Sequence, residues 1–358
     1  GKIGPGNRTP GRELLGSTPA PLTSFSRTSE RFPHNGFPHM DRALIERQLD
    51  HTLRQTDFES LGELYRGKVR DTYRQDGRLI LVTSDRISAF DHVLAQAIPL
   101  KGQILNQTAA FFFEATDDLV PNHVLSVPDP NVTVARRCRP IPIEFVVRGY
   151  LAGHAWRQYE QGARTLCGES LPDGLREGEK LPAPILTPTT KAAEGHDQDV
   201  TPDEAIARAG IDQATYDQLA QYAHALFRRG SEMAAEQGLI LVDTKYEFGR
   251  TPEGDLVLID EVHTPDSSRY YYRDGYEARL RRGEPQPQLS KEFVREWLMD
   301  HGFQGKEGET MPDLPDDLRV RVTQRYAELY ETVTGDEFEP DTHADPEARI
   351  RENLSAYS

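Results

Sequence analysis

The sequence predicts an α+β fold of two lobes, with a nucleotide cleft between antiparallel sheets and helices toward the C-terminal end. Two turn sequences carry the sheet prediction, since Asp76-Gly77 and residues 251–255 each separate two strand-like segments. Apolar residues recur with helical spacing over 291–301 and 316–332. Hairpins followed by separate helices are typical of the α+β class.

Composition narrows the classes of function. The 358 residues carry a formal net charge of −16, so nucleic acid and anionic membrane surfaces are poor partners. No apolar run approaches the roughly 20 residues that cross a bilayer. The two cysteines are too few for a disulfide framework and fit a reducing compartment. We therefore expect a cytoplasmic protein that binds small molecules, as a monomer or small homo-oligomer.

Residues 1–40 differ from the rest of the chain. They contain six prolines, six glycines and eight serines or threonines, with five basic residues against two acidic ones. This composition predicts disorder. An acid-poor, arginine-rich start also fits a transit peptide, although no clear amphipathic helix is present. An unstructured tail, or a reading frame extended upstream of a start at Met40, is the favoured interpretation.

The N-terminal lobe is expected to span residues 41–140. Alternation predicts strands over 63–67, 69–74 and 78–83. A helix is predicted over 106–115. Further strands are expected over 132–137 and 143–148. Pro140 and Pro142 separate these two strands in the prediction, which places the lobe boundary near them.

The C-terminal lobe, residues 141–358, begins with a stretch over 162–190 that is expected to be rich in loops. Helices are predicted over 202–209 and 213–237, the second ended by Gly238. A hairpin of strands 239–250 and 256–262 follows, and then the two amphipathic helices. The acidic tail from residue 334 is expected to pack loosely.

Gly67 and Lys68 form the first candidate site. Residues 62–69 have the spacing of a phosphate-binding P-loop, but Val69 stands where a magnesium-binding Ser or Thr belongs, and a strand follows instead of a helix. We therefore reject the P-loop. The remaining interpretation is a hairpin that covers nucleotide phosphates, as in kinase-like and ATP-grasp-like enzymes. An ordinary structural turn is the alternative.

Glu247 and Asp260 form the second candidate site. With the hairpin turn centred between residues 253 and 254, the two carboxylates oppose each other across the strands. Like charges in that position destabilise a sheet unless a cation lies between them. Oxygen ligands favour Mg²⁺ held together with substrate phosphates. The alternative is a solvent-facing strand with unrelated charges, although flanking leucines favour burial.

Arginines mark two anion-binding candidates. Arg148 leaves an apolar strand into a glycine-flanked turn, which suits bidentate binding of carboxylate or phosphate. A structural pair with Glu144 is the alternative. Arg269 follows two serines in a second turn. Residues 187–197 are either a linker or a lid over anionic substrates. Together these features indicate phosphoryl transfer from a nucleotide to an anionic substrate.

Five segments, in chain order, closely resemble the SAICAR synthetase family: residues 64–71 (LYRGKVRD), 84–91 (SDRISAFD), 143–150 (IEFVVRGY), 241–249 (LVDTKYEFG) and 258–269 (LIDEVHTPDSSR). The resemblance implies an ATP-dependent ligase of purine biosynthesis. Such an enzyme joins L-aspartate to carboxyaminoimidazole ribonucleotide (CAIR) and releases SAICAR, ADP and phosphate. ATP and Mg²⁺ are the implied cofactors.

The resemblance also implies roles for individual residues. Gly67 and Lys68 resemble the phosphate-covering hairpin, and Glu247 and Asp260 resemble the magnesium ligands. Lys245 resembles a charge-neutralising lysine close to the phosphates and the reacting carboxylate.

Other implied roles concern the substrates. Arg148 and Arg269 resemble clamps on carboxylates or phosphate, with Glu144 near the ribose. The remaining matches are a mobile loop on the aspartate and metal side (Lys191, Asp197), an interlobe segment whose backbone reads adenine (Arg139 to Ile141) and residues bordering the CAIR site (Ser84, Arg86). The chain departs from the family pattern at His154, where many members carry Ser, and this imidazole is expected to face the substrate.

Two other functions fit the same residues. A small-molecule kinase would phosphorylate its substrate without coupling an amine, and a decayed nucleotide-binding protein would turn nothing over. The ligase requires CAIR and aspartate together for ADP release, whereas the kinase does not require aspartate. The decayed protein is disfavoured because both metal carboxylates and the arginine clamps are present.

Overall fold

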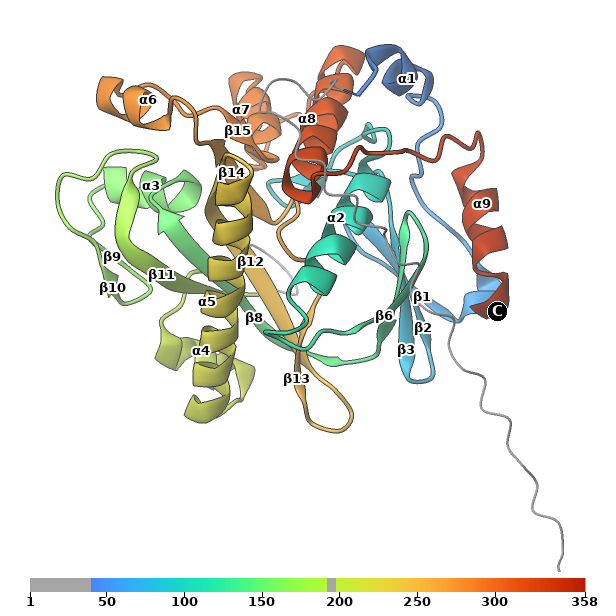
Figure 1. The fold of residues 1–358 in the computed structure, drawn as a ribbon, viewed down its shortest axis with the longest axis horizontal. Coiled ribbons are helices and arrows are strands. Elements are labelled where there is room, and N and C mark those ends of the chain that lie inside the picture. Colours follow the sequence, from blue (N-terminus) through green and yellow to red (C-terminus); the bar gives the residue numbers. More distant parts are fainter. Residues whose placement is uncertain (1–39, 192–197, 358) are drawn as a thin grey trace, which may run out of the picture. The chain divides into compact units, whose positions relative to one another are not determined.

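Two antiparallel sheets organise the residues that the computed structural model describes, 40–191 and 198–357 (Figure 1). The predicted α+β class is confirmed. The expected disordered segment, except for Met40, and the site candidate Asp197 lie outside the described residues. Met40 itself is buried in an apolar core.

The first sheet has the strand order β1-β2-β3-β7-β6. Its strands are β1 (Glu63–Arg66), β2 (Arg70–Gln75), β3 (Arg78–Thr83), β6 (Val124–Asp129) and β7 (Val132–Arg136). The second sheet has the order β11-β8-β12-β14-β15, and β13 also pairs with β12. Its strands are β8 (Arg139–Tyr150), β11 (Lys180–Thr190), β12 (Leu239–Arg250), β13 (Leu256–Ile259), β14 (Ser268–Tyr272) and β15 (Gln288–Leu289).

Helices cover both sheets. They are α1 (Arg42–Arg47), α2 (Lys101–Ala115), α3 (Gly153–Glu160), α4 (Pro202–Ala209), α5 (Gln213–Glu236), α6 (Tyr276–Arg282), α7 (Glu292–Asp300), α8 (Asp316–Thr334) and α9 (Pro346–Asn353). Short strand pairs join β4 (Ser88–Ala89) to β5 (His92–Val93) and β9 (Thr165–Leu166) to β10 (Glu169–Ser170). None of the helices in the described part of the chain has the length and apolar character needed to cross a membrane.

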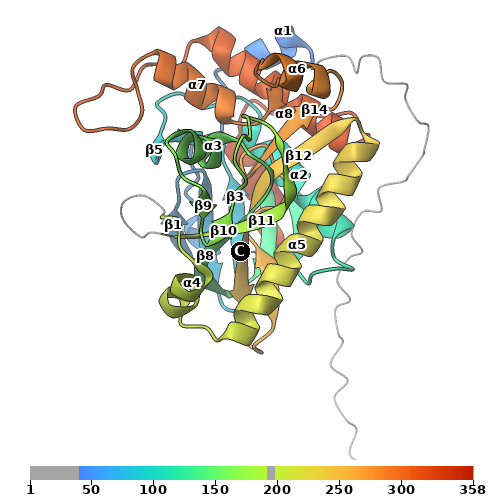
Figure 2. The same cartoon turned by 90° about the vertical axis from the view of Figure 1, so that its left-hand side faces the viewer.

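Helices contribute apolar side chains to two of the cores. Apolar residues of α5 pack on β8 and β12 in the largest core, and the helix runs along these strands in Figure 1. Residues of α1, α7 and α8 share a second core, and Figure 2 shows these helices gathered together. The N-terminus of α5 is capped by Asp212, whose carboxylate accepts from the Thr215 amide at 2.8 Å, as expected for a helix start.

Helix α2 begins five residues before the predicted start at residue 106. The difference has a tertiary cause, because the Gly102 amide donates to the Asp85 carboxylate at 2.8 Å. Asp85 thus caps a helix 17 residues further along the chain. Local sequence cannot reveal such a cap, since Leu100 and Lys101 lack the polar side chains that usually begin a helix.

Prolines misled the prediction at two strands. Pro140 and Pro142 lie inside β8 and do not end a strand, and the predicted loop over 162–190 contains the 11-residue strand β11. Pro140 pairs with Gly249 beside a register shift, and β11 is an edge strand with its own irregularity. Bulges and edges are the positions where a sheet tolerates proline.

The prediction of a loosely packed tail is wrong. Helix α9 lies against the first sheet, with Ile350 and Leu354 in its core (Figure 1). Arg349 is 6% exposed, and its guanidinium donates to the Asp129 carboxylate at 2.9 and 3.1 Å. The carboxylate is fully buried, so this ion pair anchors the C-terminal helix.

We expect Arg349→Ala to lower the free energy of unfolding by about 3 kcal/mol, because it leaves the Asp129 carboxylate buried without its cation. Urea denaturation measures the loss. Arg351→Ala is the matched control, since this side chain on the same helix is 61% exposed and should change the free energy by no more than about 0.5 kcal/mol. Equal effects of the two substitutions would contradict the anchoring role.

Candidate active site

The β12–β13 hairpin carries the two carboxylates predicted to bind metal. The predicted register is wrong by one residue, because Glu247 pairs with Ile259 and Arg250 pairs with Leu256. The connecting loop has five residues, closed by a hydrogen bond from the Thr251 amide to the Asp255 carbonyl, so its centre is Glu253. Asp260 therefore follows the end of β13, with a left-handed φ of 69°.

Glu247 nevertheless binds two lysines whose positive charge Asp260 also favours. Lys245 donates to Glu247 at 2.9 Å, and Lys191 binds the other carboxylate oxygen. Asp260 contributes to raising the pKa of both lysines. Burial alone would raise the pKa of Glu247, but Lys245 and Lys191 outweigh it and hold that pKa well below its usual range. Glu247 is therefore a carboxylate at any physiological pH.

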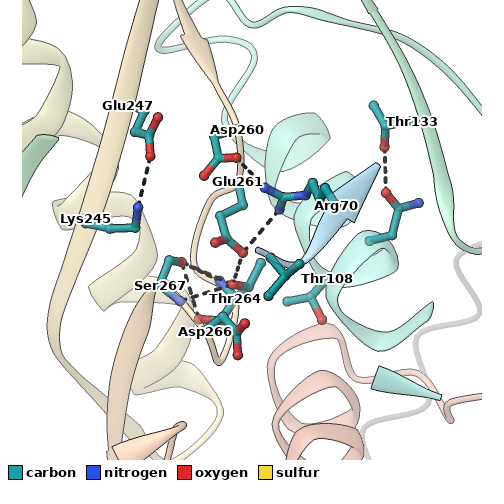
Figure 3. A network of polar contacts seen from close by, with 12 residues as sticks. Arg70, Thr108, Thr133, Lys245, Glu247, Asp260, Glu261, Thr264, Asp266 and Ser267 are labelled. Carbon is teal, nitrogen blue, oxygen red and sulfur yellow. Dashed lines mark hydrogen bonds and ion pairs between the residues drawn. The ribbon is translucent and has the colours of Figure 1, made fainter. Parts of the chain in front are cut away.

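Arg70 links the first sheet to this site. It extends from β2 and binds the Asp260 carboxylate, and its other terminal nitrogen lies 3.5 Å from Glu261 (Figure 3). Its side chain is 15% exposed. Burial would lower the pKa of Arg70, but Asp260 and Glu261 raise it above its ordinary value. A permanent cation from one sheet is thus paired with the predicted metal ligand of the other.

The donor set fits Mg²⁺ if substrate supplies part of the coordination. Glu247 and Asp260 offer only oxygen, and Mg²⁺ usually takes one or two carboxylates together with phosphates and water. No group of three or more His, Cys, Asp or Glu side chains is arranged to hold a metal within residues 40–191 and 198–357. A site made by the two carboxylates therefore depends on substrate oxygens.

Lys245 is central to the site. Its ammonium donates to Glu144 at 2.8 Å as well as to Glu247, and Thr189 donates to the other Glu144 oxygen at 3.3 Å. Burial would lower the pKa of Lys245, but Glu247 and Glu144 raise it well above its ordinary value. The side chain therefore acts as a fixed positive charge and not as a base.

A cavity of about 230 Å³ opens beside Lys245. Six cationic side chains line it, against three carboxylates, which suits an anionic ligand. The cations are Arg148, Arg157, Lys245, Arg269, Lys291 and Arg295, and the carboxylates are Asp243, Asp266 and Glu292.

Asp243 positions the two predicted arginine clamps. It pairs in register with Arg148 on β8 and with Arg269 on β14, and both guanidinium groups donate to one of its oxygens, at 3.2 and 3.0 Å. Thr187 accepts from Arg148 at 2.9 Å. The alternative of an Arg148–Glu144 pair is thus replaced by a pair with Asp243.

Gly153 permits this arrangement at the start of α3. Its φ is 55°, and a Cβ atom built there would lie 2.4 Å from the Arg269 guanidinium. Any larger residue would displace the arginine from the cavity wall.

Glu292 forms ion pairs with three arginines at the far wall of the cavity. Its carboxylate lies 3.0 Å from Arg295, 3.2 Å from Arg269 and 3.4 Å from Arg157. Burial would raise the pKa of Glu292, but Arg269 and Arg295 lower it from 4.5 to about 2.

This shift predicts a pH dependence. Between pH 4.5 and 2 the unfolded chain protonates Glu292 while the folded chain does not, so the free energy of unfolding falls as pH falls. The contribution is roughly 3 kcal/mol and is fully present above pH 4.5. Urea denaturation from pH 6 to 2 should show a shallower dependence in Glu292→Gln, whereas the exposed control Glu307→Gln should match the wild type. Identical slopes in all three proteins would contradict the assignment.

The remaining predicted residues lie around the first hairpin. Arg86 donates to the Gly67 and Lys68 carbonyls at 3.0 and 3.1 Å, and to Asp71 at 2.8 Å. The Ser84 hydroxyl donates to the Val69 carbonyl at 2.8 Å. Ser84 and Arg86 therefore hold the Gly67-Lys68 turn in place and do not line the cavity. Their predicted place beside CAIR stays a prediction.

Two further predicted positions lie at the start of β8. Arg139 pairs with Arg250, and Ile141 is buried in the largest core. Lys68 is half-exposed and donates to Asp91 at 2.5 Å. The structure thus brings Lys245, Arg148, Arg269 and His154 to one cavity. Glu144 and Glu247 bind Lys245, and Lys191 binds Glu247.

Comparison with known proteins identifies this arrangement. The family model described as SAICAR synthetase matches residues 63–312. The chain belongs to the SAICAR synthetase family. A protein of Cytophaga hutchinsonii named phosphoribosylaminoimidazole-succinocarboxamide synthase is 55% identical over 84% of this chain and 98% of its own. A protein of the same name from Bacteroides thetaiotaomicron is 52% identical over 84% of this chain and 97% of its own.

Solved structures agree with the family assignment. A SAICAR synthase of Saccharomyces cerevisiae, complexed with SAICAR, superposes with a TM-score of 0.69 at 32% identity, over 80% of this chain and all of that one. A SAICAR synthetase in complex with ADP superposes with a TM-score of 0.61 at 26% identity, over 78% of this chain and all of that one. The SAICAR synthetase family thus accounts for both sheets of the fold.

Several residues in or beside the cavity were given no role by the sequence analysis. Glu292, Lys291 and Arg295 stand at the start of α7, which the sequence presents only as an amphipathic helix. The side chain of Asp266 is buried. The Tyr326 hydroxyl donates to its carboxylate at 2.6 Å, and the Lys101 ammonium lies 3.0 Å from it. Both partners are far from Asp266 in the sequence. Arg70 offered one signal, because it follows the predicted Gly67-Lys68 turn by two positions.

Proposed function

We propose that the chain joins L-aspartate to CAIR with ATP and releases SAICAR, ADP and phosphate. The position of Lys245 carries the proposal. Its ammonium lines the cation-rich cavity and also binds Glu144 and Glu247, so it connects an anion-binding cavity with Glu247, one of the two proposed metal ligands. The names of the relatives and the SAICAR and ADP complexes of the neighbours support the same reaction.

The chemistry explains why these groups stand together. A carboxylate does not react with an amine, because an oxide ion is a poor leaving group. Transfer of the ATP γ-phosphoryl group to the CAIR carboxylate converts that oxygen into a phosphate leaving group. The aspartate amine then attacks the acyl carbon, and phosphate departs with the oxygen that it gained.

Fixed charges in the site favour both steps. Lys245 lies where negative charge moves between phosphate and carboxylate, and its raised pKa keeps it charged throughout. Arg148 and Arg269 bind anionic substrate groups, and Asp243 fixes their orientation. Glu247 and Asp260 would hold Mg²⁺, which neutralises phosphate charge when it is bound.

Nucleotide contacts follow from the first lobe. We place the Gly67-Lys68 turn over the phosphates and the backbone of Arg139 to Ile141 beside adenine, at a lobe boundary near residue 140. Arg86 and Ser84 keep the turn rigid. Lys191 and Asp197 are assigned to the aspartate side on the family resemblance alone. The two cysteines are free, which fits a cytoplasmic reaction.

An omission assay tests this proposal. Purified protein with Mg-ATP should release ADP and form a succinocarboxamide product only when CAIR and aspartate are both present. ADP release that needs CAIR but not aspartate would instead identify a kinase. Absence of turnover, with ATP binding retained, would identify a decayed nucleotide-binding protein.

A further inference from the structure

His154 faces the same cavity but has no part in the reaction as described so far. It lies in the first turn of α3, directly after Gly153, and lines the cavity together with Arg148 and Lys245. Its side chain is 54% exposed, so the ring is open to a ligand there.

A carboxylate holds one edge of the His154 ring, and a neighbouring amide holds the carboxylate. The Nε2 atom lies 2.9 Å from the Asp199 carboxylate and 2.7 Å from the Gln158 amide nitrogen. Gln158 also donates to the same Asp199 oxygen at 2.7 Å. Asp199 is itself fixed, because it forms a β-bridge with Thr189 on β11. Three elements thus define the orientation of the imidazole.

This contact determines which nitrogen is basic. The hydrogen bond with His154 and the burial of Asp199 oppose each other, and the hydrogen bond prevails and lowers the pKa of Asp199. Asp199 can only accept, so its contact with Nε2 places the ring proton on that atom. The Gln158 amide then donates to Asp199 and not to the ring, and the Nδ1 lone pair stays free to accept a proton. Nδ1 has no hydrogen-bond partner among the described residues.

We propose that His154 accepts the proton released when the aspartate amine attacks, and that Asp199 and Gln158 position its ring. The inference rests on the proposed ligase function and adds a base to it. Lys245 cannot serve, because it stays protonated, and arginine does not lose its proton. Burial lowers the pKa of Lys291, but its ammonium lies 3.7 Å from the Asp266 carboxylate and is directed to that partner.

The proton balance of the step is simple. The neutral amine nitrogen forms a C–N bond to the acyl carbon and becomes positively charged. The C–O bond to phosphate breaks, and phosphate leaves with the electron pair. Nδ1 of His154 takes the proton from nitrogen, which yields the neutral amide and an imidazolium. The proton then passes to water.

The charges around His154 explain the need for Asp199. Cations face it from α3 (Arg157), β8 (Arg148), β12 (Lys245) and β14 (Arg269), and from α7 by Lys291 and Arg295. Asp243, Asp266 and Glu292 are the carboxylates across the cavity, and each already binds cations of its own. Asp199 is the carboxylate in direct contact with the ring, so it stabilises the imidazolium.

His154→Gln tests the proposal, because the amide nitrogen can keep the contact with Asp199 but cannot accept a proton. We expect kcat to fall about 100-fold. We also expect the wild-type rate to fall on the acidic side of its pH profile, and this acidic limb should be absent from the variant. Asp199→Asn should keep that limb but move it to lower pH, a change that a purely structural role would not produce. His301→Gln, at the C-cap of α7 and outside the cavity lining, is the control.

An assay of phosphoryl transfer to CAIR alone distinguishes a failure of this inference from a failure of the proposed function. With CAIR and no aspartate, exchange of ¹⁸O between the bridging and non-bridging positions of ATP should proceed equally in wild type and His154→Gln. Loss of exchange in the wild type, together with no product, would defeat the proposed function. Normal exchange and product in the wild type, with an unchanged kcat and acidic limb in His154→Gln, would overturn the role of His154. If His154→Gln does not fold, an unmoved limb in Asp199→Asn would overturn it.

Discussion

Replacing Glu247 with glutamine is expected to lower kcat about 1,000-fold or more. The carboxylate is 5% exposed, and both of its oxygens bind ammonium groups, from Lys245 and Lys191. Glutamine has a similar shape but removes the negative charge that would hold Mg²⁺ and orient Lys245. A steady-state assay with both substrates measures kcat. Circular dichroism should show an intact fold, because the surrounding sheet is unchanged.

Glu253→Gln is the matched control for that experiment. It is the same chemical change at the exposed centre of the β12–β13 loop, and kcat should remain at the wild-type value. A Glu247→Gln protein with near-normal turnover would refute the metal-ligand and lysine-orienting role of this carboxylate.

Arg269→Ala is expected to reduce kcat/KM by about 100-fold and the free energy of unfolding by about 3 kcal/mol. Its side chain is 11% exposed and binds both Asp243 and Glu292. Removal of the guanidinium therefore withdraws a substrate clamp and leaves two buried carboxylates with fewer cations. Steady-state kinetics and urea denaturation measure the two effects on the same preparation.

Two variants sharpen the test of Arg269. Arg282→Ala removes an exposed arginine that pairs with Glu284, and it should alter neither quantity. Arg269→Lys keeps the charge but not the two-pronged geometry, so stability should recover more than kcat/KM does. Unfolding at lower urea with unchanged kcat/KM would mean that Arg269 serves the fold alone.

Elements whose bounds depend on the local sequence pattern were predicted correctly. The strands 78–83 and 239–250 and the helix 202–209 have the predicted bounds, because alternation and caps define them locally. β11 was missed because its prolines hide an edge strand, and α9 because its anchor is Asp129, far away in the sequence. The register of the β12–β13 hairpin depended on the loop length, which turn residues alone did not settle.

In the candidate site too, the residues in short motifs were predicted and their remote partners were not. Lys245, Glu247, Arg148 and Arg269 belong to short motifs with a chemical rationale, and three of them line the cavity. Their partners come from remote segments: Asp199 holds His154, and Glu292 holds Arg269. A carboxylate at the start of an amphipathic helix carries no local sign that three arginines of the folded chain surround it.

The central claim is that the CAIR carboxylate is activated by phosphoryl transfer. CAIR labelled with ¹⁸O in that carboxylate, incubated with ATP, Mg²⁺ and aspartate, tests it most directly by mass spectrometry of the released phosphate. The mechanism predicts one ¹⁸O atom in each phosphate formed with SAICAR. Unlabelled phosphate, with the second ¹⁸O atom released into water, would contradict it.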